Sequence, residues 1–258
     1  MKRFLILTIA AVISLSSCSI LANRSWDAGQ LVAAASNAMT AMSLSDAEII
    51  QLSQQTVAQL DAQNTIDNGT YAKRLNNIMK GITQVEGLKL NYKVYKTQEV
   101  NAFACGDGSI RVYSGLMDVM NDDEVMAIIG HEIGHVVHQD TKNALKSAYL
   151  AAAARNVAGA AGGVLGTIAQ SAAGGLAEAF VSSQYSQKQE YAADEYGYQF
   201  ATSHGRSPYS MYNSLAKLLT LSSSSQSSLV QKMFSSHPDT ATRAERMKAK
   251  ADAAVKNK

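Results

Sequence analysis

Two histidines placed one helical turn apart constrain the fold of this chain more than any other feature of its 258 residues. His131 and His135 are four positions apart, so on a helix both imidazoles lie on one face and can reach a single metal ion at about 2.1 Å. Glu132 follows the first histidine directly and lies beside that face without being a ligand. The apolar residues of 125–129 recur at helical spacing. A helix that carries a metal site is therefore expected.

This histidine pair matches the chemistry of a hydrolytic zinc site. Zinc polarises a carbonyl and lowers the pKa of its water to about 7, and Glu132 is placed to accept the proton that this water loses. The same carboxylate can then hand the proton to the leaving amine of a cleaved amide. The alternative is a surface histidine pair with an incidental glutamate, but the strongly patterned helix favours the catalytic interpretation.

A catalytic zinc needs a third protein ligand and keeps one position open. Glu190 and Asp194 are four residues apart, so one carboxylate could bind the ion while the other orients a ligand histidine. From spacing alone, two acids at that interval are more often a solvated helix face. His138 lies about 10.5 Å along the helix from His131, too far for one ion to bind all three histidines, so we expect it to be a capping or supporting residue.

The period of the pattern changes just before the motif helix. Apolar and polar residues alternate over 88–94, and 100–104 and 109–113 look like two further strands joined by a turn at Gly106-Asp107-Gly108. A small antiparallel sheet is therefore expected to pack on the motif helix, in a chain that is otherwise mostly helical. The expected fold class is α+β.

Two capping boxes mark helix starts, Ser45 with Glu48 and Asn121 with Glu124. We expect helices over about 45–62, 71–82, 121–139 and 184–203, one that starts at Ser207-Pro208 with the proline in first position, and a last one opened by His237-Pro238.

The segment 150–181 is rich in Ala, Gly and Ser, and residues 156–177 carry no charge. Its length allows a transmembrane helix, but its many glycines and few large apolar residues make insertion into a membrane weakly favourable. We expect a mobile lid or a helical hairpin beside the site.

The N-terminus resembles a lipoprotein signal peptide. Two basic residues precede an apolar stretch over 4–13 that is too short to span a bilayer stably. It ends in Leu-Ser-Ser-Cys18, which is similar to the bacterial lipobox, in which the cysteine is acylated and becomes the first residue. We expect 1–17 to be removed and 18–44 to form a lipid-anchored tether and N-terminal helix. An ordinary signal peptide with a chance cysteine is the alternative.

The residues around the predicted lipidation site limit location and redox chemistry. Ser19 replaces the aspartate that usually marks inner-membrane retention, so we expect the outer membrane. Cys105 is then the only cysteine besides Cys18, which excludes a disulfide within one mature chain. We interpret Cys105 as a small residue near a turn, with a reactive thiol or an intermolecular bridge as alternatives. The net charge of +2 provides no broad basic field for nucleic acid.

Several segments together resemble the M48 (Ste24/HtpX-like) family of zinc metallopeptidases. The matching segments are 92–95, 100–104, 110–117, His131–His135, Glu190–Asp194, and His237-Pro238 with Arg243. The resemblance implies a zincin-like metallopeptidase domain over 45–255, mostly helical, with a small antiparallel sheet packed on the motif helix. It also implies one Zn²⁺ held by His131, His135 and Glu190, with Asp194 as the supporting acid.

The resemblance also points to residues beside the cleft. A strand edge there could pair with an extended substrate backbone, giving affinity with little sequence selectivity. Its residues are Asn101, Ala102, Phe103 and Ala104. Phe103 could equally be core. His237 could approach the zinc and hold the enzyme closed, stabilise the tetrahedral oxyanion as a catalytic residue, or merely start a helix. Arg243 could pair with an acid near the site or be a surface charge.

The expected function is zinc-dependent endoproteolysis of unfolded or misassembled envelope proteins, by an enzyme anchored in the outer membrane and facing the periplasm. The main alternative is a non-catalytic assembly or chaperone-like lipoprotein that binds outer-membrane proteins, and a protease could also have such assembly partners. A zinc hydrolase of peptidoglycan amides and a structural zinc site are weaker alternatives; a site with three protein ligands favours catalysis. The integral-membrane relatives have hydrophobic spans that this chain lacks after its signal, so their substrates are not expected here.

Overall fold

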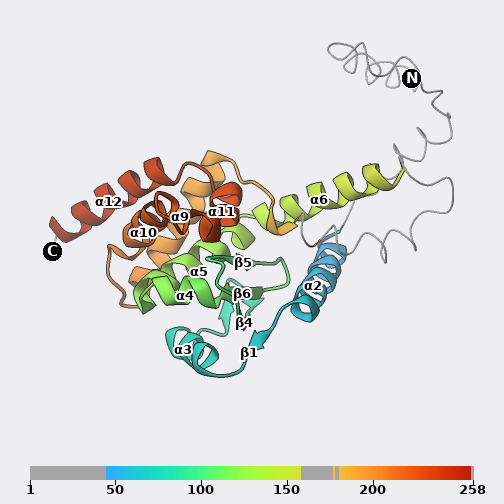
Figure 1. Ribbon diagram of the computed structural model, residues 1–258, viewed down its shortest axis with the longest axis horizontal. Helices are drawn as coiled ribbons and strands as arrows, with labels where there is room; N and C mark the ends of the chain where they lie inside the picture. The colour runs from blue at the N-terminus through green and yellow to red at the C-terminus, as the bar shows by residue number, and fades with distance from the viewer. Residues whose placement is uncertain (1–44, 158–176, 178–179, 257–258) are drawn as a thin grey trace, which may run out of the picture.

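The computed structural model describes residues 45–157, 177 and 180–256 (Figure 1). The predicted signal peptide over 1–17, Cys18 and the tether over 18–44 lie outside the described residues. Most of the segment 150–181 lies outside them too, so the lid expected there stays a prediction. None of the helices in the described part of the chain combines the length and the apolar character that crossing a membrane requires.

The described chain is mostly helical. Its helices are α2 (Asp46–Gln63), α3 (Thr70–Ile78), α4 (Ser114–Val119), α5 (Asp122–Val137), α6 (Asp140–Val157), α9 (Gln187–Ser203), α10 (Ser210–Ser222), α11 (Ser227–Ser236) and α12 (Thr240–Lys256). Its strands are β1 (Ile66–Asp67), β2 (Gln84–Val85), β3 (Leu88–Lys89), β4 (Asn91–Tyr95), β5 (Ala102–Ala104) and β6 (Ser109–Tyr113). Figure 1 shows α5 in the middle, between the strands and the C-terminal helices.

The predicted helix starts with local caps are confirmed. Ser45 caps α2 and Asn121 caps α5, each in a complete capping box with the glutamate three residues on. In the second box the Glu124 backbone N–H donates to Asn121 Oδ1 at 3.0 Å, while the Asn121 N–H donates to Glu124 Oε2 at 2.9 Å. Both boxes form because sequence neighbours satisfy the orphan N–H groups of the first turn.

Two helix starts that the sequence placed at proline are wrong. Pro208 lies in the turn before α10, which begins at Ser210. His237 ends a helix that the sequence did not predict, α11, and the last helix begins only at Thr240. Asp239 takes the left-handed region with φ 64° between the two, so the chain turns sharply after Pro238 and brings His237 inward.

The predicted small sheet is present, but it is mixed rather than purely antiparallel. Its order is β1-β4-β6-β5, with β5 antiparallel to β6 and β4 parallel to β6. The tight turn after β5 makes the first pairing antiparallel. Gly108 is required in that turn, because φ is +85° and a Cβ would lie 2.0 Å from the Lys89 carbonyl oxygen. The alternation of apolar and polar residues did not show that β4 would pair with β6 on the side opposite to β5.

The approach of α5 to α9 is made possible by glycines on both helices. A Cβ on Gly130 or Gly134 would lie 2.8 or 2.9 Å from the Cβ of Phe200 or Tyr196 on α9. A Cβ on Gly197 would lie 2.7 Å from the Ala127 carbonyl oxygen on α5. Real Cβ atoms do not approach so closely, so each glycine allows the two backbones to come together. The motif histidines on α5 thereby face the first turns of α9.

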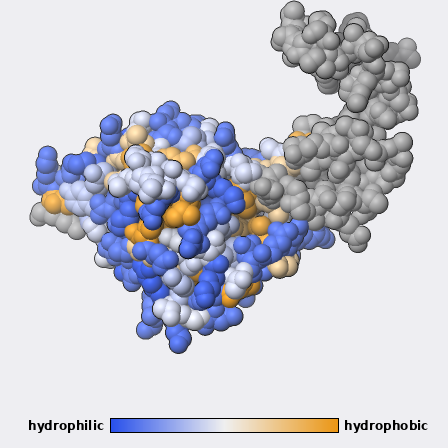
Figure 2. Space-filling view, in the orientation of Figure 1, coloured by the Kyte–Doolittle hydropathy of each residue, from blue (hydrophilic) through white to orange (hydrophobic). Residues whose placement is uncertain are grey.

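Helix α5 is buried nearly all round, as a helix in the centre of a domain should be. Its apolar residues join one core cluster with the sheet and with α9 and α10. The face shown in Figure 2 is largely hydrophilic, with scattered hydrophobic residues.

Helix α2 is attached to the other face of the sheet by a buried ion pair. The Asp61 carboxylate accepts hydrogen bonds from Arg111 Nε at 2.8 Å, from the Tyr95 hydroxyl at 2.8 Å and from Lys93 Nζ at 2.6 Å. Burial alone would raise the pKa of Asp61, but these donors lower it to about 2, so the carboxylate stays ionised.

Candidate metal centre

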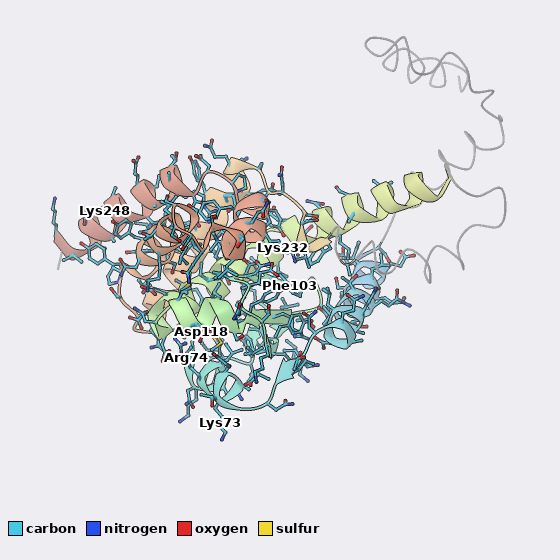
Figure 3. All side chains as sticks on the ribbon, viewed as in Figure 1. Lys73, Arg74, Phe103, Asp118, Lys232 and Lys248 are labelled. Carbon is cyan, nitrogen blue, oxygen red and sulfur yellow. The ribbon has the colours of Figure 1, made fainter. Side chains whose placement is uncertain are left out.

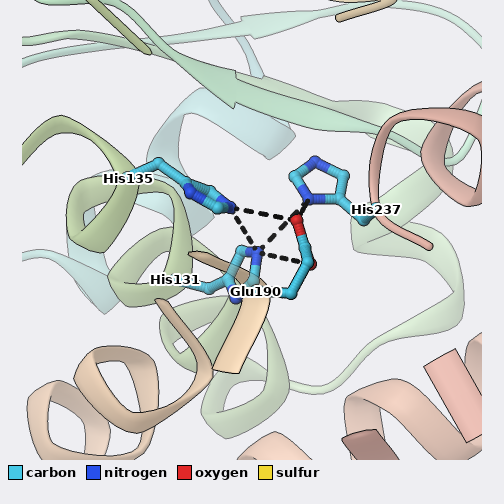
Figure 4. Close-up of side chains that lie close together, drawn as sticks. All are labelled: His131, His135, Glu190 and His237. Atoms are coloured by element: carbon cyan, nitrogen blue, oxygen red, sulfur yellow. Dashed lines mark hydrogen bonds and ion pairs between the residues drawn. The ribbon is translucent and has the colours of Figure 1, made fainter. Parts of the chain in front are cut away.

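Four metal-binding side chains from three separate helices meet in the interior (Figure 4). His131 and His135 come from α5, Glu190 from the first turn of α9, and His237 from the C-terminal end of α11. One ligand atom from each lies within 4.8 Å of the others, and all four side chains are buried. The structure thus brings Glu190 and His237 to the histidine pair; for His237 this approach was one of the three alternatives that the sequence left open.

The spacing of the donor atoms suits one tetrahedral ion. Ligands about 2.0–2.1 Å from zinc would lie about 3.3 Å from one another. The two Nε2 atoms of His131 and His135 are 3.1 Å apart. Glu190 Oε1 lies 3.4 Å from His135 Nε2, and Glu190 Oε2 lies 3.7 Å from His131 Nε2. The donors therefore need little movement to surround an ion.

A second layer of carboxylates orients both histidine rings. His131 Nδ1 lies 3.0 Å from Asp194 Oδ1, and His135 Nδ1 lies 3.0 Å from Asp140 Oδ2. With its Nδ1–H held by a carboxylate, each ring presents Nε2 to the common point. Asp140 Oδ1 also accepts a hydrogen bond from Gln189 Nε2 at 2.7 Å, which joins the start of α6 to α9 next to Glu190.

Arg243 of α12 joins the acids of this layer. Its Nε and Nη2 donate to the two Asp194 oxygens at 2.8 and 2.6 Å, and Nη1 contacts Glu190 Oε2. Only 2% of its side chain is exposed, so it is not a surface charge. The guanidinium therefore fixes the positions of both carboxylates beside the histidine pair.

The interior around the four donors is strongly negative. Glu132, Asp140, Glu190 and Asp194 are all buried, and Arg243 is the one buried arginine that contacts them among the described residues. Buried carboxylates are costly unless a cation or donor offsets them. A divalent cation between the histidines supplies that missing charge, so the residues present fit a metal ion.

The pKa of His135 shows the same excess of negative charge, whereas the cationic groups beside Asp194 and Glu190 lower the pKa values of those two acids. Burial alone would raise the pKa of Asp194, but Arg243 and His131 lower it to about 2, and Glu190 is held below its ordinary value beside His237 and His135. Burial would lower the pKa of His135, yet the carboxylates around it raise its pKa to about 9. Burial lowers the pKa of His131, so its ring is neutral. A metal ion would displace the proton that His135 otherwise holds.

Glu132 and Tyr185 border the four donors. Glu132 is 2% exposed, and its Oε1 makes no hydrogen bond within the described part of the chain and lies 3.6 Å from His237 Nε2. Tyr185 stacks on His135 with ring centroids 3.8 Å apart, and its N–H donates to the Ser236 carbonyl at 3.2 Å. The tyrosine therefore covers one side of the site.

The other residues considered from the sequence lie away from the four donors. His138 is the C-cap of α5, which agrees with the capping role expected for it, and His204 is the C-cap of α9. Cys105 is buried, and burial raises the pKa of its thiol, which keeps it protonated and unreactive.

Strand β5 is an edge of the sheet. The Asn101 carbonyl accepts a hydrogen bond from the Tyr113 N–H, and the Cys105 N–H donates to the Ser109 carbonyl. Because bonded and non-bonded pairs alternate along an antiparallel ladder, the backbone groups of Ala102 and Ala104 point away from β6. Phe103 packs against Tyr113 and Phe180, so its side chain is core. The Ala102 N–H donates to Asn101 Oδ1. The Phe103 side chain is therefore not available to a substrate, and the substrate-binding role of this strand edge stays a prediction.

Asp140 and Tyr185 were missed by sequence reasoning. Asp140 is five residues after His135, an interval that lies off the face of a continuous helix. It reaches the ring because the chain turns at Gln139, whose φ is 63°. Tyr185 falls within the helix expected over 184–203, but α9 begins only at Gln187, so the tyrosine lies before the helix and its position could not be predicted from helical spacing. Arg243 was found only through the resemblance, with its role left open.

Comparison with known proteins gives extended matches. Residues 70–251 match the sequence profile of Peptidase family M48. Metalloprotease LoiP of Escherichia coli K12 is 41% identical over 243 residues, which cover 93% of this chain and 95% of LoiP. Metalloprotease YcaL of the same organism is 35% identical over 225 residues, or 86% of this chain and 87% of YcaL. Protease HtpX of Legionella pneumophila is 34% identical over 90 residues, 33% of this chain.

Proposed function

The chain belongs to peptidase family M48 and is a metalloendopeptidase, and we propose that it is a zinc enzyme that cleaves unfolded or misassembled proteins of the bacterial cell envelope. One observation carries the proposal. Two imidazoles of α5 and a carboxylate of α9 lie at the spacing that one ion requires. Beside them, Glu132 has a carboxylate oxygen that makes no hydrogen bond within the described residues.

The donor set favours zinc over other ions. Two neutral imidazoles with one carboxylate are a recurrent set for catalytic zinc, whereas calcium and magnesium prefer sites made only of oxygen ligands. When bound, the ion would polarise the substrate carbonyl and lower the pKa of water to about 7. His131, His135 and Glu190 would hold it, while Asp194 and Asp140 fix the two rings.

Glu132 would move the proton during hydrolysis. Its Oε1 has no hydrogen-bond donor among the described residues, although it is buried beside the donor atoms. Such an oxygen can take the proton of the attacking water and return it to the leaving amine. A carboxylate already hydrogen-bonded to protein donors would be a weaker base.

The edge of β5 would position the substrate backbone. The backbone groups of Ala104 and the carbonyl of Ala102 point to the side away from β6, while the Ala102 N–H donates to Asn101 Oδ1. An extended polypeptide could add there as a further strand, and backbone pairing does not depend on side-chain sequence. Only an unfolded segment offers such a backbone, which supports a preference for unfolded proteins.

His237 would close the site. Its Nδ1 lies 3.0 Å from Glu190 Oε1 and 3.4 Å from His131 Nε2, so it lies where a fourth ligand would be. Four protein ligands would complete a tetrahedral site, and catalysis requires one open position. His237 must therefore withdraw before substrate enters.

The location is proposed from the N-terminal segment. Its lipobox-like Leu-Ser-Ser-Cys18 and the following Ser19 support a lipid anchor in the outer membrane, with the domain in the periplasm. In that compartment the substrates would be envelope proteins that have failed to fold or assemble.

Glu132→Gln should abolish proteolysis without releasing the metal. Loss of the proton-accepting carboxylate removes about 10²–10⁴-fold in rate, whereas the ligands remain. The measurement is cleavage of unfolded casein together with zinc per chain by mass spectrometry, with the exposed Glu245→Gln as control. Equal cleavage by Glu132→Gln and wild type would contradict the proposed mechanism, whereas an assembly function that survives Glu132→Gln would reveal a binding role.

His237→Ala should increase peptide cleavage, because more molecules would have an open ligand position. We expect kcat/KM to rise roughly threefold or more, in proportion to the fraction of molecules released from the closed state. The control is His204→Ala, outside the site. A fall in kcat at unchanged zinc content would instead show that His237 stabilises the oxyanion, and would refute the closing role.

Cys18→Ala should release the protein from the membrane. Wild type expressed in a Gram-negative host should fractionate with outer membranes and incorporate labelled palmitate, while the variant becomes soluble in the periplasm. Cys105→Ala is the matched cysteine control and should keep the label. A Cys18→Ala protein that remains in the membrane fraction would refute lipid anchoring at this residue.

A further inference from the structure

A cavity lies beside the chain segment that leads into β5. It has a volume of about 460 Å³, within the range of about 300–1,000 Å³ that is usual for ligand pockets. Its walls come from the end of α2, the loop before β5, the end of β6, the segment before Tyr185, and α11. Its lining includes Leu60, Glu99, Tyr113, Val181 and Lys232.

We propose that this cavity is a substrate subsite that binds a lysine or arginine side chain of the cleaved polypeptide, with the Glu99 carboxylate as its acceptor. The proposal rests on the proposed protease function, because it names a class of substrate for the same active site. It concerns a side chain near the scissile bond, and it adds sequence preference to the sequence-independent pairing along β5.

The cavity lies within a few residues of the metal centre along three chain segments. Lys232 is five residues before His237, about 7.5 Å along α11. Glu99 is three residues before Ala102, and Val181 is four before Tyr185. An extended peptide advances about 3.3 Å per residue. A substrate lying along β5 therefore places a side chain in the cavity two or three residues from the scissile bond.

The loop before β5 and helix α11 are joined by a backbone hydrogen bond, so these two walls of the cavity are fixed relative to each other. The Val100 N–H donates to the Leu229 carbonyl at 2.9 Å. Lys232 lies one turn further on, and Figure 3 labels it on α11 together with Phe103 on β5. Phe103 in turn packs edge-on against Tyr113, a wall of the cavity.

Glu99 supplies the acceptor. Its side chain lines the cavity and is 23% exposed, and its Oε2 accepts a hydrogen bond from Lys232 Nζ at 3.2 Å. Its Oε1 is inaccessible to solvent and makes no hydrogen bond in the described part of the chain, so the carboxylate has fewer donors than a buried group needs. A cationic side chain of the substrate that replaced Lys232 at Oε2 would make a charge-assisted hydrogen bond.

The rest of the cavity suits a long side chain with a charged end. Leu60, Val181 and the ring of Tyr113 can contact the aliphatic stem of lysine or arginine. Burial and the nearby Glu99 raise the pKa of the Tyr113 hydroxyl, so it stays neutral and adds no second negative charge.

Lys232 does not make the cavity a site for acids. Its side chain is 55% exposed, whereas that of Glu99 is 23% exposed. The lysine can therefore move into solvent when a substrate cation arrives, at little cost, since exposed ion pairs are weak. Glu99 remains at the cavity and determines the sign of the preferred charge.

The test is a positional profile of cleavage. Wild-type protein digests unfolded casein, the cut sites are mapped by mass spectrometry, and matched quenched peptides with Lys, Leu or Glu at the enriched position give kcat/KM. We expect enrichment of Lys and Arg two or three residues from the cut. In Glu99→Gln the ratio of kcat/KM for Lys over Leu peptides should fall at least tenfold, mainly through KM.

Two further variants make the outcome independent of the folding of Glu99→Gln. Lys232→Gln removes the internal competitor, so the Lys-over-Leu ratio should rise. Glu245→Gln, on the exposed face of α12, should leave the ratio as in wild type. A ratio that Lys232→Gln lowers, or that Glu99→Gln leaves intact, would overturn the proposal.

Failure of the subsite and failure of the protease function give different results. Casein cleaved by wild type without any charge preference overturns the subsite alone. A cleavage profile that favours acidic residues, and that loses this preference in Lys232→Gln, would also overturn the subsite alone. If wild type and Glu132→Gln cleave casein equally, the protease function itself fails, whatever the profile.

Discussion

The close contact between α5 and α9 is the constraint on which the rest of the structure depends. Gly130, Gly134 and Gly197 remove the Cβ atoms that would separate the two backbones. Only at that distance can Glu190, in the first turn of α9, reach the face of α5 that carries the two histidines. The sheet and the remaining helices bury this pair of helices, and their contribution to the site is mainly to exclude water and to supply supporting charges.

Charge balance explains why so many ionic groups meet in the interior. Asp194 and Glu190 share Arg243, and Asp140 contacts a histidine and Gln189. The carboxylates still outnumber the buried cation, which raises the pKa of His135. A divalent ion resolves that imbalance. Asp140 and Asp194, which would otherwise destabilise the fold, then orient the two ligand histidines. Together with Arg243, these residues come from α6, α9 and α12.

The sequence predicted what depends on neighbours along the chain. Intervals of three or four residues predicted the two capping boxes and the histidine pair. Glu132 was found because it directly follows His131. Glu190 could not be chosen from spacing alone, because many acids share that interval; the family resemblance selected it. Asp140 required the turn at Gln139, and His237 required the turn at Asp239 after an unpredicted helix. The mixed sheet depended on which side of β6 received β4, a choice made by tertiary packing.

The account depends on one ion held between α5 and α9. The most direct measurement is a crystal structure of the zinc-loaded protein with anomalous diffraction recorded on both sides of the zinc absorption edge. We predict one strong peak in the chain interior, about 2.0–2.2 Å from His131 Nε2, His135 Nε2 and a Glu190 oxygen. A zinc peak elsewhere, or one at the histidine pair that Glu190 does not contact, would contradict the account.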